Sequence, residues 1–356
     1  MSGPGAGGLA SGSGGRVTPV VRVAPAKLNL TLAVVGRRAD GFHALHSVMA
    51  PLDLADRLAI SPAFGPDDRL HVVGTGGAPA PDLGPADENL VLRAIRAARA
   101  AVRAAGDDRR LPALTVRLEK RIPAAAGLAG GSSDGAAALD GALEAWGIDD
   151  LLGPEARSAV AASLGSDCPF FLAGGWALVE GRGERVTPLP APRGEAPGVV
   201  LVTPMVAVAT AATFARHAAG FRPEGATALL SSRYFAGELQ AGLSTARLLE
   251  RAGVLSMAND LVPATNHLVP ALVASKRALG RLLERPIGQS GSGPTLWALS
   301  PSKADAMGDA AIVRAAIADG LLSFPGDQPP FVAAAALVGV QAPTTSTVHS
   351  PLHPSS

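Results

Sequence analysis

The sequence has few of the features that mark secreted, membrane or nucleic-acid-binding proteins. Its single cysteine, Cys168, excludes a disulfide framework and is typical of a reducing cytoplasm. It contains no run of about 18 apolar residues that could form a membrane span. The formal net charge is +1, aromatic residues make up 4%, and no cluster of basic side chains is interleaved with aromatic ones. We therefore expect a cytoplasmic protein with neither a membrane nor a nucleic acid as its partner.

Two common nucleotide-binding fingerprints are also missing. No G-x-x-x-x-G-K-[ST] occurs, because the chain has no Gly-Lys pair, and no G-x-G-x-x-G follows a strand. Instead, the segment 121–134 places three glycines and two serines directly before an Ala-rich amphipathic run, and Ser132 or Ser133 could cap the helix that follows. A glycine turn that enters a helix presents unpaired backbone N–H groups to anions. The segment predicts a phosphate-binding loop; a plain flexible turn is the alternative.

Polar and apolar residues alternate in the segment 26–32. The alternation places Lys27, Asn29 and Thr31 on one face of a strand and the apolar residues on the other face. A lysine and an asparagine are thereby presented side by side. A solvent-exposed strand face explains the pattern as well as a functional site does, so both interpretations stay open on these residues alone.

An aspartate lies at a boundary between two predicted elements. A helix over residues 155–164 ends at Gly165, Asp167 follows, and the Phe-Phe pair at 170–171 belongs to a predicted apolar strand. Pro169 favours an extended or turn conformation at this boundary. We expect the carboxylate to be partly buried there, and an aspartate that closes an Asx turn is the alternative.

Dense proline between residues 187 and 197 indicates a domain boundary. We predict an N-terminal domain over residues 17–190, a C-terminal domain over 198–340, and disordered tails over 1–16 and 341–356. Helical spacing predicts helices over residues 88–105, 155–164, 211–219, 234–251, 270–284 and 303–319. Apolar runs predict strands over residues 114–118, 199–202, 295–299 and 331–338, and a second glycine-rich turn covers 288–294.

Seven segments, taken in order, resemble the GHMP small-molecule kinases. They are residues 24–30, 37–43, 88–90, 123–134, 165–171, 259–261 and 289–294, and the match runs from about Val21 to Val338. Each segment is weakly specific alone, but seven of them in the right order make a specific signal. Segments 37–43 and 165–171 are typical of members whose alcohol substrate carries a cytidine diphosphate.

The resemblance implies a two-domain α+β fold. Its N-terminal α/β domain would be like ribosomal protein S5 domain 2, and its C-terminal α+β domain would be ferredoxin-like. ATP would lie along the glycine loop and donate its γ-phosphoryl group to an alcohol in the cleft between the domains, with Mg²⁺ as the expected metal ion. Such reactions depend on positioning and on neutralising charge. We expect a monomer or a homodimer.

The resemblance also assigns roles to individual residues. Asp167 would take the proton of the attacking hydroxyl, and Lys27 would stabilise the developing alkoxide and keep the acid ionised. The expected ATP-binding residues are Pro123, Ala124, Ala125, Ala126, Gly127, Leu128, Ala129, Gly130, Gly131, Ser132, Ser133, Asn89 and Lys120. The expected substrate-binding residues are Asn29, Phe42, His43, Thr210, Phe214, Gly291 and Ser292.

Within the substrate group, the resemblance implies that Phe42 stacks on the cytosine, that His43 bonds the edge of the base, and that Phe214 closes its other face. Asp134 would either reach Mg²⁺ through water or complement the helix dipole, two roles that the pattern does not separate.

Four residues depart from the family pattern, and one of them, Gly135, replaces the usual alanine and should weaken the start of the helix a little. Phe42 stands where tyrosine is usual, so stacking is retained but a hydroxyl contact is lost. Ala129 stands where glycine is common, and Ala125 where glycine or methionine is common. Because alanine does not adopt positive φ easily, we expect the loop to differ slightly from its relatives.

Two other functions remain as alternatives. One is a different GHMP kinase, of the homoserine or mevalonate type, and segments 37–43 and 165–171 argue against it. The other is a non-catalytic, ligand-binding relative. Lys27 and Asp167 argue against that alternative, because a sensor needs neither a base nor an electrophilic lysine.

Overall fold

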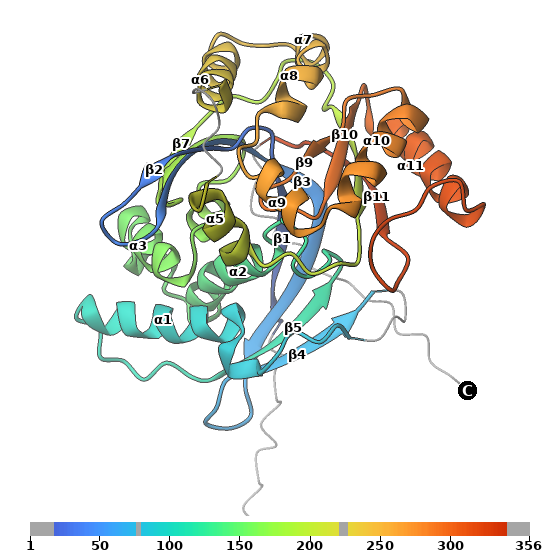
Figure 1. Ribbon diagram of the computed structural model, residues 1–356. Coiled ribbons are helices and arrows are strands. Elements are labelled where there is room, and N and C mark those ends of the chain that lie inside the picture. The colour runs from blue at the N-terminus through green and yellow to red at the C-terminus, as the bar shows by residue number, and fades with distance from the viewer. Residues whose placement is uncertain (1–17, 76–79, 221–226, 340–356) are drawn as a thin grey trace, which may run out of the picture.

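The computed structural model describes residues 18–75, 80–220 and 227–339. The tails predicted over 1–16 and 341–356 lie outside these residues. The described chain contains two β-sheets, one of seven strands from its first half and one of four strands from its second half (Figure 1). None of the helices in these ranges is long and apolar enough to cross a bilayer.

The first sheet is built around one long strand, β3 (His43–Pro62). Its strand order is β4-β5-β3-β6-β7, and β1 and β2 also pair with β3. The other strands are β1 (Val20–Asn29), β2 (Ala33–Arg37), β4 (Arg69–Gly74), β5 (Leu114–Lys120), β6 (Ala177–Gly181) and β7 (Arg185–Pro188). The pairing of β1 with β3 shifts register between Pro25 and Lys27, at a proline that has no N–H to donate. This irregularity lies directly before the lysine singled out from the sequence.

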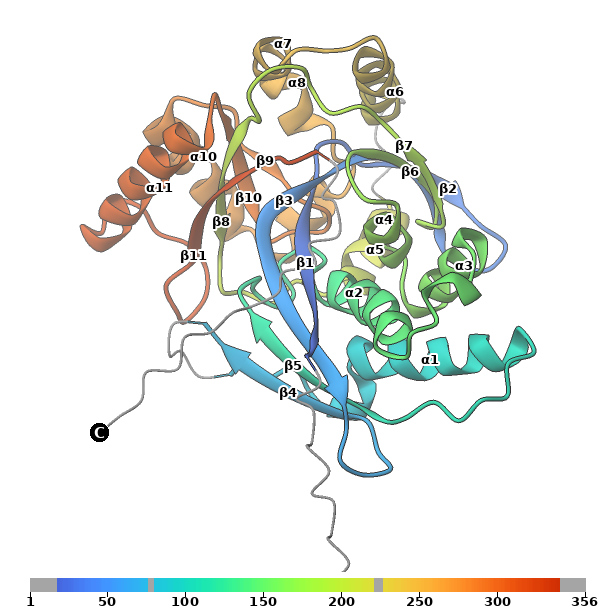
Figure 2. The same ribbon diagram turned by 180° about the vertical axis from the view of Figure 1, so that it is seen from behind.

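Four helices accompany the first sheet. They are α1 (Leu90–Ala104), α2 (Gly130–Ala145), α3 (Pro154–Leu164) and α4 (Cys168–Ala173), and α1 to α3 gather beside β1 and β3 (Figure 2). The apolar stripe of α1 is buried, including Val91, Ile95 and Val102, in one cluster with Leu58 and Leu118 of the sheet. Burial of these faces holds the start of α2, and the loop before it, against the sheet.

The second sheet is antiparallel, in the order β11-β8-β10-β9. Its strands are β8 (Gly198–Thr203), β9 (Gly288–Gln289), β10 (Leu296–Ser300) and β11 (Phe331–Ala336), and α10 (Ala271–Leu283) and α11 (Lys303–Ala318) pack beside it. The helices α5 (Thr210–Ala218), α6 (Thr227–Gln240), α7 (Thr245–Glu250), α8 (Ala252–Met257) and α9 (Val262–Leu268) lie between β8 and α10 in the sequence.

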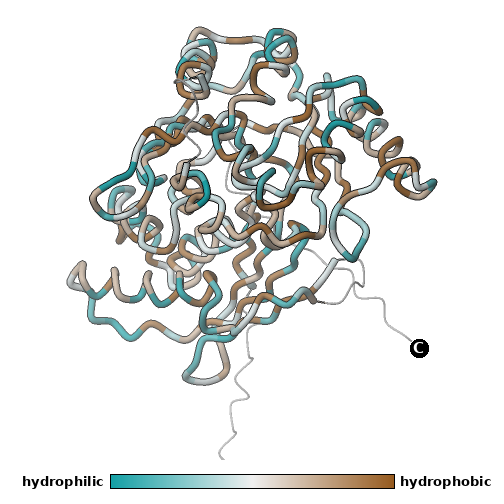
Figure 3. Tube along the Cα trace, viewed as in Figure 1, coloured by the Kyte–Doolittle hydropathy of each residue, from teal (hydrophilic) through white to brown (hydrophobic). Residues whose placement is uncertain are grey.

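One hydrophobic core joins the two halves. It packs Leu28 and Leu52 of the first sheet against Leu201 and Trp297 of the second sheet and Phe235 of α6. Figure 3 shows hydrophobic residues along the strands at the centre and more hydrophilic segments around them. The first sheet ends with β7 and the second begins with β8, on either side of the proline-rich segment; the domain limits drawn there remain a prediction.

Most helices and strands expected from the sequence are present within one or two residues, but three local predictions are wrong. The Phe-Phe pair at 170–171 lies in helix α4 and not in a strand, because Pro169 occupies the first turn, where proline is tolerated. The helix predicted over 234–251 is divided into α6 and α7 around Gly242, which has φ +82°. Helix α2 begins at Gly130, so Ser132 and Ser133 lie inside its first turn and do not cap it.

Two glycine-to-alanine changes, one in β8 and one in α6, test the packing of these elements and should change the stability in opposite directions. A Cβ on Gly198, at the start of β8, would lie 2.0 Å from the carbonyl oxygen of Ser302, whereas a Cβ on Gly237 in α6 would meet nothing within 4 Å. We expect Gly198→Ala to lower the free energy of unfolding by about 1–3 kcal/mol or more. Gly237→Ala should raise it by about 0.5–1 kcal/mol, because alanine favours the helix.

Urea unfolding of both variants checks the two signs. Equal stability of the wild type and Gly198→Ala would show that β8 and the turn before α11 are not in close contact.

Candidate active site

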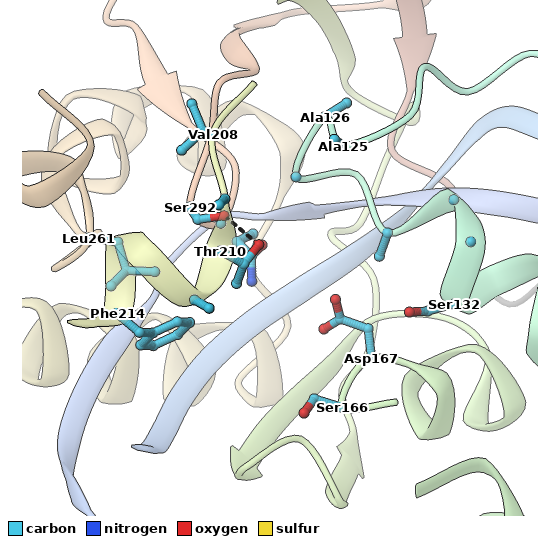
Figure 4. Close-up of a pocket in the computed structure, with 18 of the residues that line it drawn as sticks. Ala125, Ala126, Ser132, Ser166, Asp167, Val208, Thr210, Phe214, Leu261 and Ser292 are labelled. Carbon is cyan, nitrogen blue, oxygen red and sulfur yellow. Dashed lines mark hydrogen bonds between the residues drawn. The ribbon is translucent and has the colours of Figure 1, made fainter. Parts of the chain in front are cut away.

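A cleft of about 1310 Å³ lies between the glycine loop of the first half and the second glycine turn and α5 of the second half. Every predicted site residue lines this cleft except Leu128 and Ser133, which are buried. Asp167 and Ser132 lie on one side and Thr210, Phe214 and Ser292 on the other (Figure 4). The cleft therefore collects segments that are far apart in the sequence, while the role of each residue toward a ligand stays a prediction.

Lys27 is a buried charged group of the cleft wall. Its Nζ donates to Asn29 Oδ1 at 2.5 Å and to the carbonyl of Gly127 at 3.0 Å, and lies 3.9 Å from Asp167 Oδ2. Burial lowers the pKa of Lys27, and the nearby carboxylate of Asp167 opposes that shift. The contact with Asn29 confirms that the alternating strand places both side chains on one face.

Asp167 is held at the start of α4 but remains accessible. Its side chain is 32% exposed, and it makes no side-chain capping hydrogen bond to the helix. The carboxylate is therefore partly buried, as expected, and does not serve as a helix cap. Its position beside Lys27 and at the open cleft suits a group that accepts a proton from a bound molecule.

The glycine loop turns through three left-handed residues, Ala125, Gly127 and Ala129, with φ of 52°, 74° and 55°. Alanine at two of these positions does not prevent the left-handed turn, although the conformation costs roughly 1–2 kcal/mol for a residue with a Cβ. After Ala129 the chain enters α2, and Gly130 and Gly131 of its first turn line the cleft. The positive end of a 16-residue helix thus faces the cavity.

The second glycine turn docks directly on the first. Ser290 Oγ donates to the carbonyl of Gly127 at 2.9 Å, and the backbone N–H of Asn29 donates to the same Oγ at 3.3 Å. Asn259 Nδ2 donates to the carbonyls of Gln289 and Gly291 at 3.0 and 2.9 Å. The hydroxyl of Ser290 therefore joins the two halves of the molecule at the floor of the cleft, through backbone groups of Asn29 and Gly127.

Each aromatic ring predicted for the substrate lies against a neighbouring side chain. The ring of His43 stacks on Phe214 with centroids 5.1 Å apart, and Thr210 Oγ1 lies 3.1 Å from Ser292 Oγ nearby. The guanidinium of Arg182 lies over the ring of Phe42 at 5.3 Å. Burial, together with Coulombic interactions with His217 and Arg37, lowers the pKa of His43 below its usual value, which favours the neutral imidazole.

A buried charge cluster under the glycine loop includes Asp56, a residue that sequence reasoning missed. Lys120 Nζ donates to a carboxylate oxygen of Asp56 and, at 2.8 Å, to Asp134 Oδ2. Asp56 Oδ1 also accepts the backbone N–H groups of Arg121 and Ile122 at 2.5 and 2.9 Å. The cluster ties the end of β5 to β3 and to α2, and so fixes both ends of the loop.

The pKa values of this cluster are shifted by burial and by mutual charge. Burial raises the pKa of Asp134 to about 7, and the ammonium of Lys120 opposes that shift. Burial lowers the pKa of Lys120, but Asp134 and Asp56 together raise it above its usual value. Asp56 could have been found from its pattern, because it falls in phase with Leu58 and Ile60 on the buried face of β3.

The remaining predicted residue on this side is Asn89. It caps α1, with its Oδ1 accepting the backbone N–H of Val91 at 3.0 Å, and it borders the cleft. A contact of Asn89 with a nucleotide stays a prediction.

Comparisons with known proteins identify the chain. A model of the GHMP kinases N terminal domain matches residues 89–175. The 4-diphosphocytidyl-2-C-methyl-D-erythritol kinases of Pelotomaculum thermopropionicum and Deinococcus radiodurans are each 38% identical, over 79% and 83% of this chain and 89% of each relative. A crystal structure of 4-(cytidine 5'-diphospho)-2C-methyl-D-erythritol kinase is 30% identical with a TM-score of 0.60, and the match covers 89% of this chain and 99% of that one.

The fold and the cleft define a GHMP kinase, an ATP-dependent phosphotransferase built on two β-sheets with helices packed beside them. Within that superfamily, the chain belongs to the 4-diphosphocytidyl-2-C-methyl-D-erythritol kinase family. The homoserine kinase of Cytophaga hutchinsonii has a TM-score of 0.61 at 18% identity, over 92% of this chain and 98% of that one, and therefore shares the fold alone. The predicted family and fold are confirmed.

The contact between the two glycine turns can be tested at Gly127. A Cβ there would lie 2.5 Å from the carbonyl oxygen of Ser290, at φ +74°. We expect Gly127→Ala to separate the turns and lower the rate of ADP release at least tenfold, with a lower melting temperature.

Ala125→Gly is the matched control in the same loop. It should keep activity and change stability by less than about 1 kcal/mol, because relief of left-handed strain is offset by the greater entropy of glycine in the unfolded chain. Full activity of Gly127→Ala would show that the close contact is not needed.

Proposed function

We propose that the chain transfers the γ-phosphoryl group of ATP to the 2-hydroxyl of 4-diphosphocytidyl-2-C-methyl-D-erythritol, giving the 2-phosphate and ADP. This is a step in the methylerythritol phosphate pathway to isoprenoid precursors. The observation that carries the proposal is the pair formed by Lys27 and Asp167, 3.9 Å apart at the floor of a cleft that the N-terminus of α2 also faces. A base, a cation and an anion-binding helix end are the groups that phosphoryl transfer to an alcohol requires.

Asp167 takes the proton of the attacking hydroxyl. The freed oxygen bonds the γ-phosphorus, and the bond from that phosphorus to the bridging oxygen of ADP breaks, so ADP leaves with the electron pair. The buried ammonium of Lys27 stabilises the negative charge on the attacking oxygen, and its hydrogen bonds to Asn29 and Gly127 fix its position. The protein contributes position and charge to a transition state that is loose and highly charged.

The triphosphate lies on the loop over residues 123–133, with backbone N–H groups and the end of α2 as its donors. Asn89 and Lys120 are assigned to the adenosine side. The residues present fit a Mg²⁺ ion, since Asp134 Oδ1 has no hydrogen-bond partner among the described residues and would hold the ion through water. When bound, that ion would neutralise phosphate charge.

The cytidine end of the substrate is assigned to the opposite end of the cleft. Phe42 stacks on one face of the base, Phe214 closes the other, and the neutral imidazole of His43 offers both a donor and an acceptor to the base edge. Asn29 contributes to the substrate site from the face of β1 that also carries Lys27, and Thr210 lies beside Phe214 on α5. The support for this assignment is that these side chains share one cavity and that Phe42 is 49% exposed toward solvent.

Asp167→Asn tests the proposed base. The amide cannot take the proton, so kcat should fall by about a hundredfold or more, while the Kd for ATP changes little. A coupled ADP-release assay with the cytidyl substrate, homoserine and mevalonate in parallel measures turnover, and calorimetry measures ATP binding. Ser166→Ala, on the neighbouring exposed residue, is the control. Near wild-type turnover of Asp167→Asn would remove Asp167 from the role of base.

Phe42→Ala tests the proposed stacking of Phe42 on the cytosine ring. Because stacking contributes about 1–3 kcal/mol per base, the KM for the cytidyl substrate should rise about fivefold or more, with the KM for ATP unchanged. Phe64→Ala removes a phenylalanine that is fully exposed and outside the cleft lining, and should leave both KM values unchanged. An equal rise of both KM values in Phe42→Ala would contradict the stack.

A further inference from the structure

The turn between β6 and β7 contacts both ends of the proposed substrate site. Of its three residues, Arg182 and Glu184 contact the segment around Phe42, and Gly183 packs against Ser166. No pattern in the sequence singled them out.

Arg182 covers one face of Phe42. Its guanidinium lies 5.3 Å from the ring centroid, within the range of a cation–π contact. The same guanidinium donates from Nη2 to the carbonyl of Ala162 at 2.9 Å, which fixes its orientation. Because half of Phe42 is exposed, the core does not hold this ring, and Arg182 supplies a fixed surface behind it.

Glu184 ties the backbone around Phe42 to the same turn. Its carboxylate pairs with Arg38 at 3.0 Å and accepts the backbone N–H of Arg182 at 2.6 Å. The backbone N–H of Arg38 donates to the carbonyl of Phe42 at 2.8 Å, and the N–H of Phe42 donates to Asp40 Oδ1 at 3.2 Å. Both the ring and the main chain of Phe42 are thus held by residues 182–184.

Gly183 reaches the opposite end of the site. It is buried, it has φ +125°, and a Cβ on it would lie 2.0 Å from the carbonyl oxygen of Ser166. Ser166 immediately precedes Asp167. The turn therefore packs against the backbone that carries the proposed base, at a distance that only glycine permits.

We propose that the turn Arg182-Gly183-Glu184 is a positioning element that sets the separation between the ring of Phe42 and the carboxylate of Asp167. This inference rests on the proposed function. A substrate with its nucleobase at one end and its reacting hydroxyl at the other must be held at both ends at once. A small misplacement of the hydroxyl is enough to slow transfer, so a rigid connection between the two ends matters for turnover.

Arg182 is tested by a double-mutant cycle with Phe42. Arg182→Ala should raise the KM for the cytidyl substrate about two- to fivefold, the size of an exposed cation–π contact, and lower kcat because the hydroxyl is held less well, with the KM for ATP unchanged. In a Phe42→Ala background, Arg182→Ala should add no further change. If the effect persists in that background, Arg182 contacts the substrate directly and the positioning role is overturned.

The role of Gly183 is tested by comparing the change in kcat with the change in KM in the variant Gly183→Ala. Gly183→Ala should lower kcat at least tenfold, with a smaller change in the KM for the cytidyl substrate, because Asp167 is displaced and Phe42 is not. Gly147→Ala is the matched control, since Gly147 also has positive φ but a Cβ there meets nothing within 4 Å. Melting temperatures of both variants separate unfolding from misplacement. If both variants lower kcat equally at equal stability, the positioning role is overturned.

Failure of the proposed function gives a different result. In that case the wild type would release ADP with another alcohol and not with the cytidyl substrate. Gly183→Ala assayed with that alcohol should still lower kcat, because its contact with Ser166 does not involve the cytidine. An unchanged kcat there would overturn the positioning role by itself.

Discussion

The site depends on the burial of one ammonium group, that of Lys27. A buried charge is destabilising by several kcal/mol unless nearby groups compensate it, so partners must come to it from other segments. Asn29 comes from its own strand, the carbonyl of Gly127 from the glycine loop, and Asp167 from the start of α4. Ser290 bonds the same carbonyl from the second half of the chain. The groups that compensate the buried charge of Lys27 therefore form the floor of the cleft.

A second buried cation holds the loop from below. Lys120 lies between Asp56 and Asp134, and Asp56 also accepts two backbone N–H groups where β5 leads into the loop. The loop is thus fixed at its beginning by Asp56 and at its end by Asp134 in α2. Removing one partner of such a cluster would leave a buried charge without compensation, which is far more destabilising than loss of an exposed ion pair.

The sequence predicted the parts of the site that local chemistry determines. Alternation placed Lys27 beside Asn29, and the glycines before an amphipathic run located the loop and α2. It did not predict the contributions of Asp56 or of the turn at residues 182–184, because their partners lie far away in the sequence. The period of β3 places Asp56 on the buried face but does not place it beside Lys120, and a Gly-Arg-Gly-Glu turn has no motif of its own. The Phe-Phe pair was assigned to a strand because short apolar runs fit strands and buried helices equally.

The two alanines at positive φ show how the loop tolerates its departure from glycine. Between them, Ala126 and Leu128 are buried, and the carbonyl of Leu128 accepts the backbone N–H of Lys27 at 3.0 Å. These contacts determine the path of the chain independently of the residues at the turns, so the strain at Ala125 and Ala129 is offset by packing and hydrogen bonds elsewhere. Alanine has fewer accessible conformations than glycine in the unfolded chain, which offsets part of the same strain. The left-handed turns therefore come from tertiary contacts and not from the local preference of the alanines.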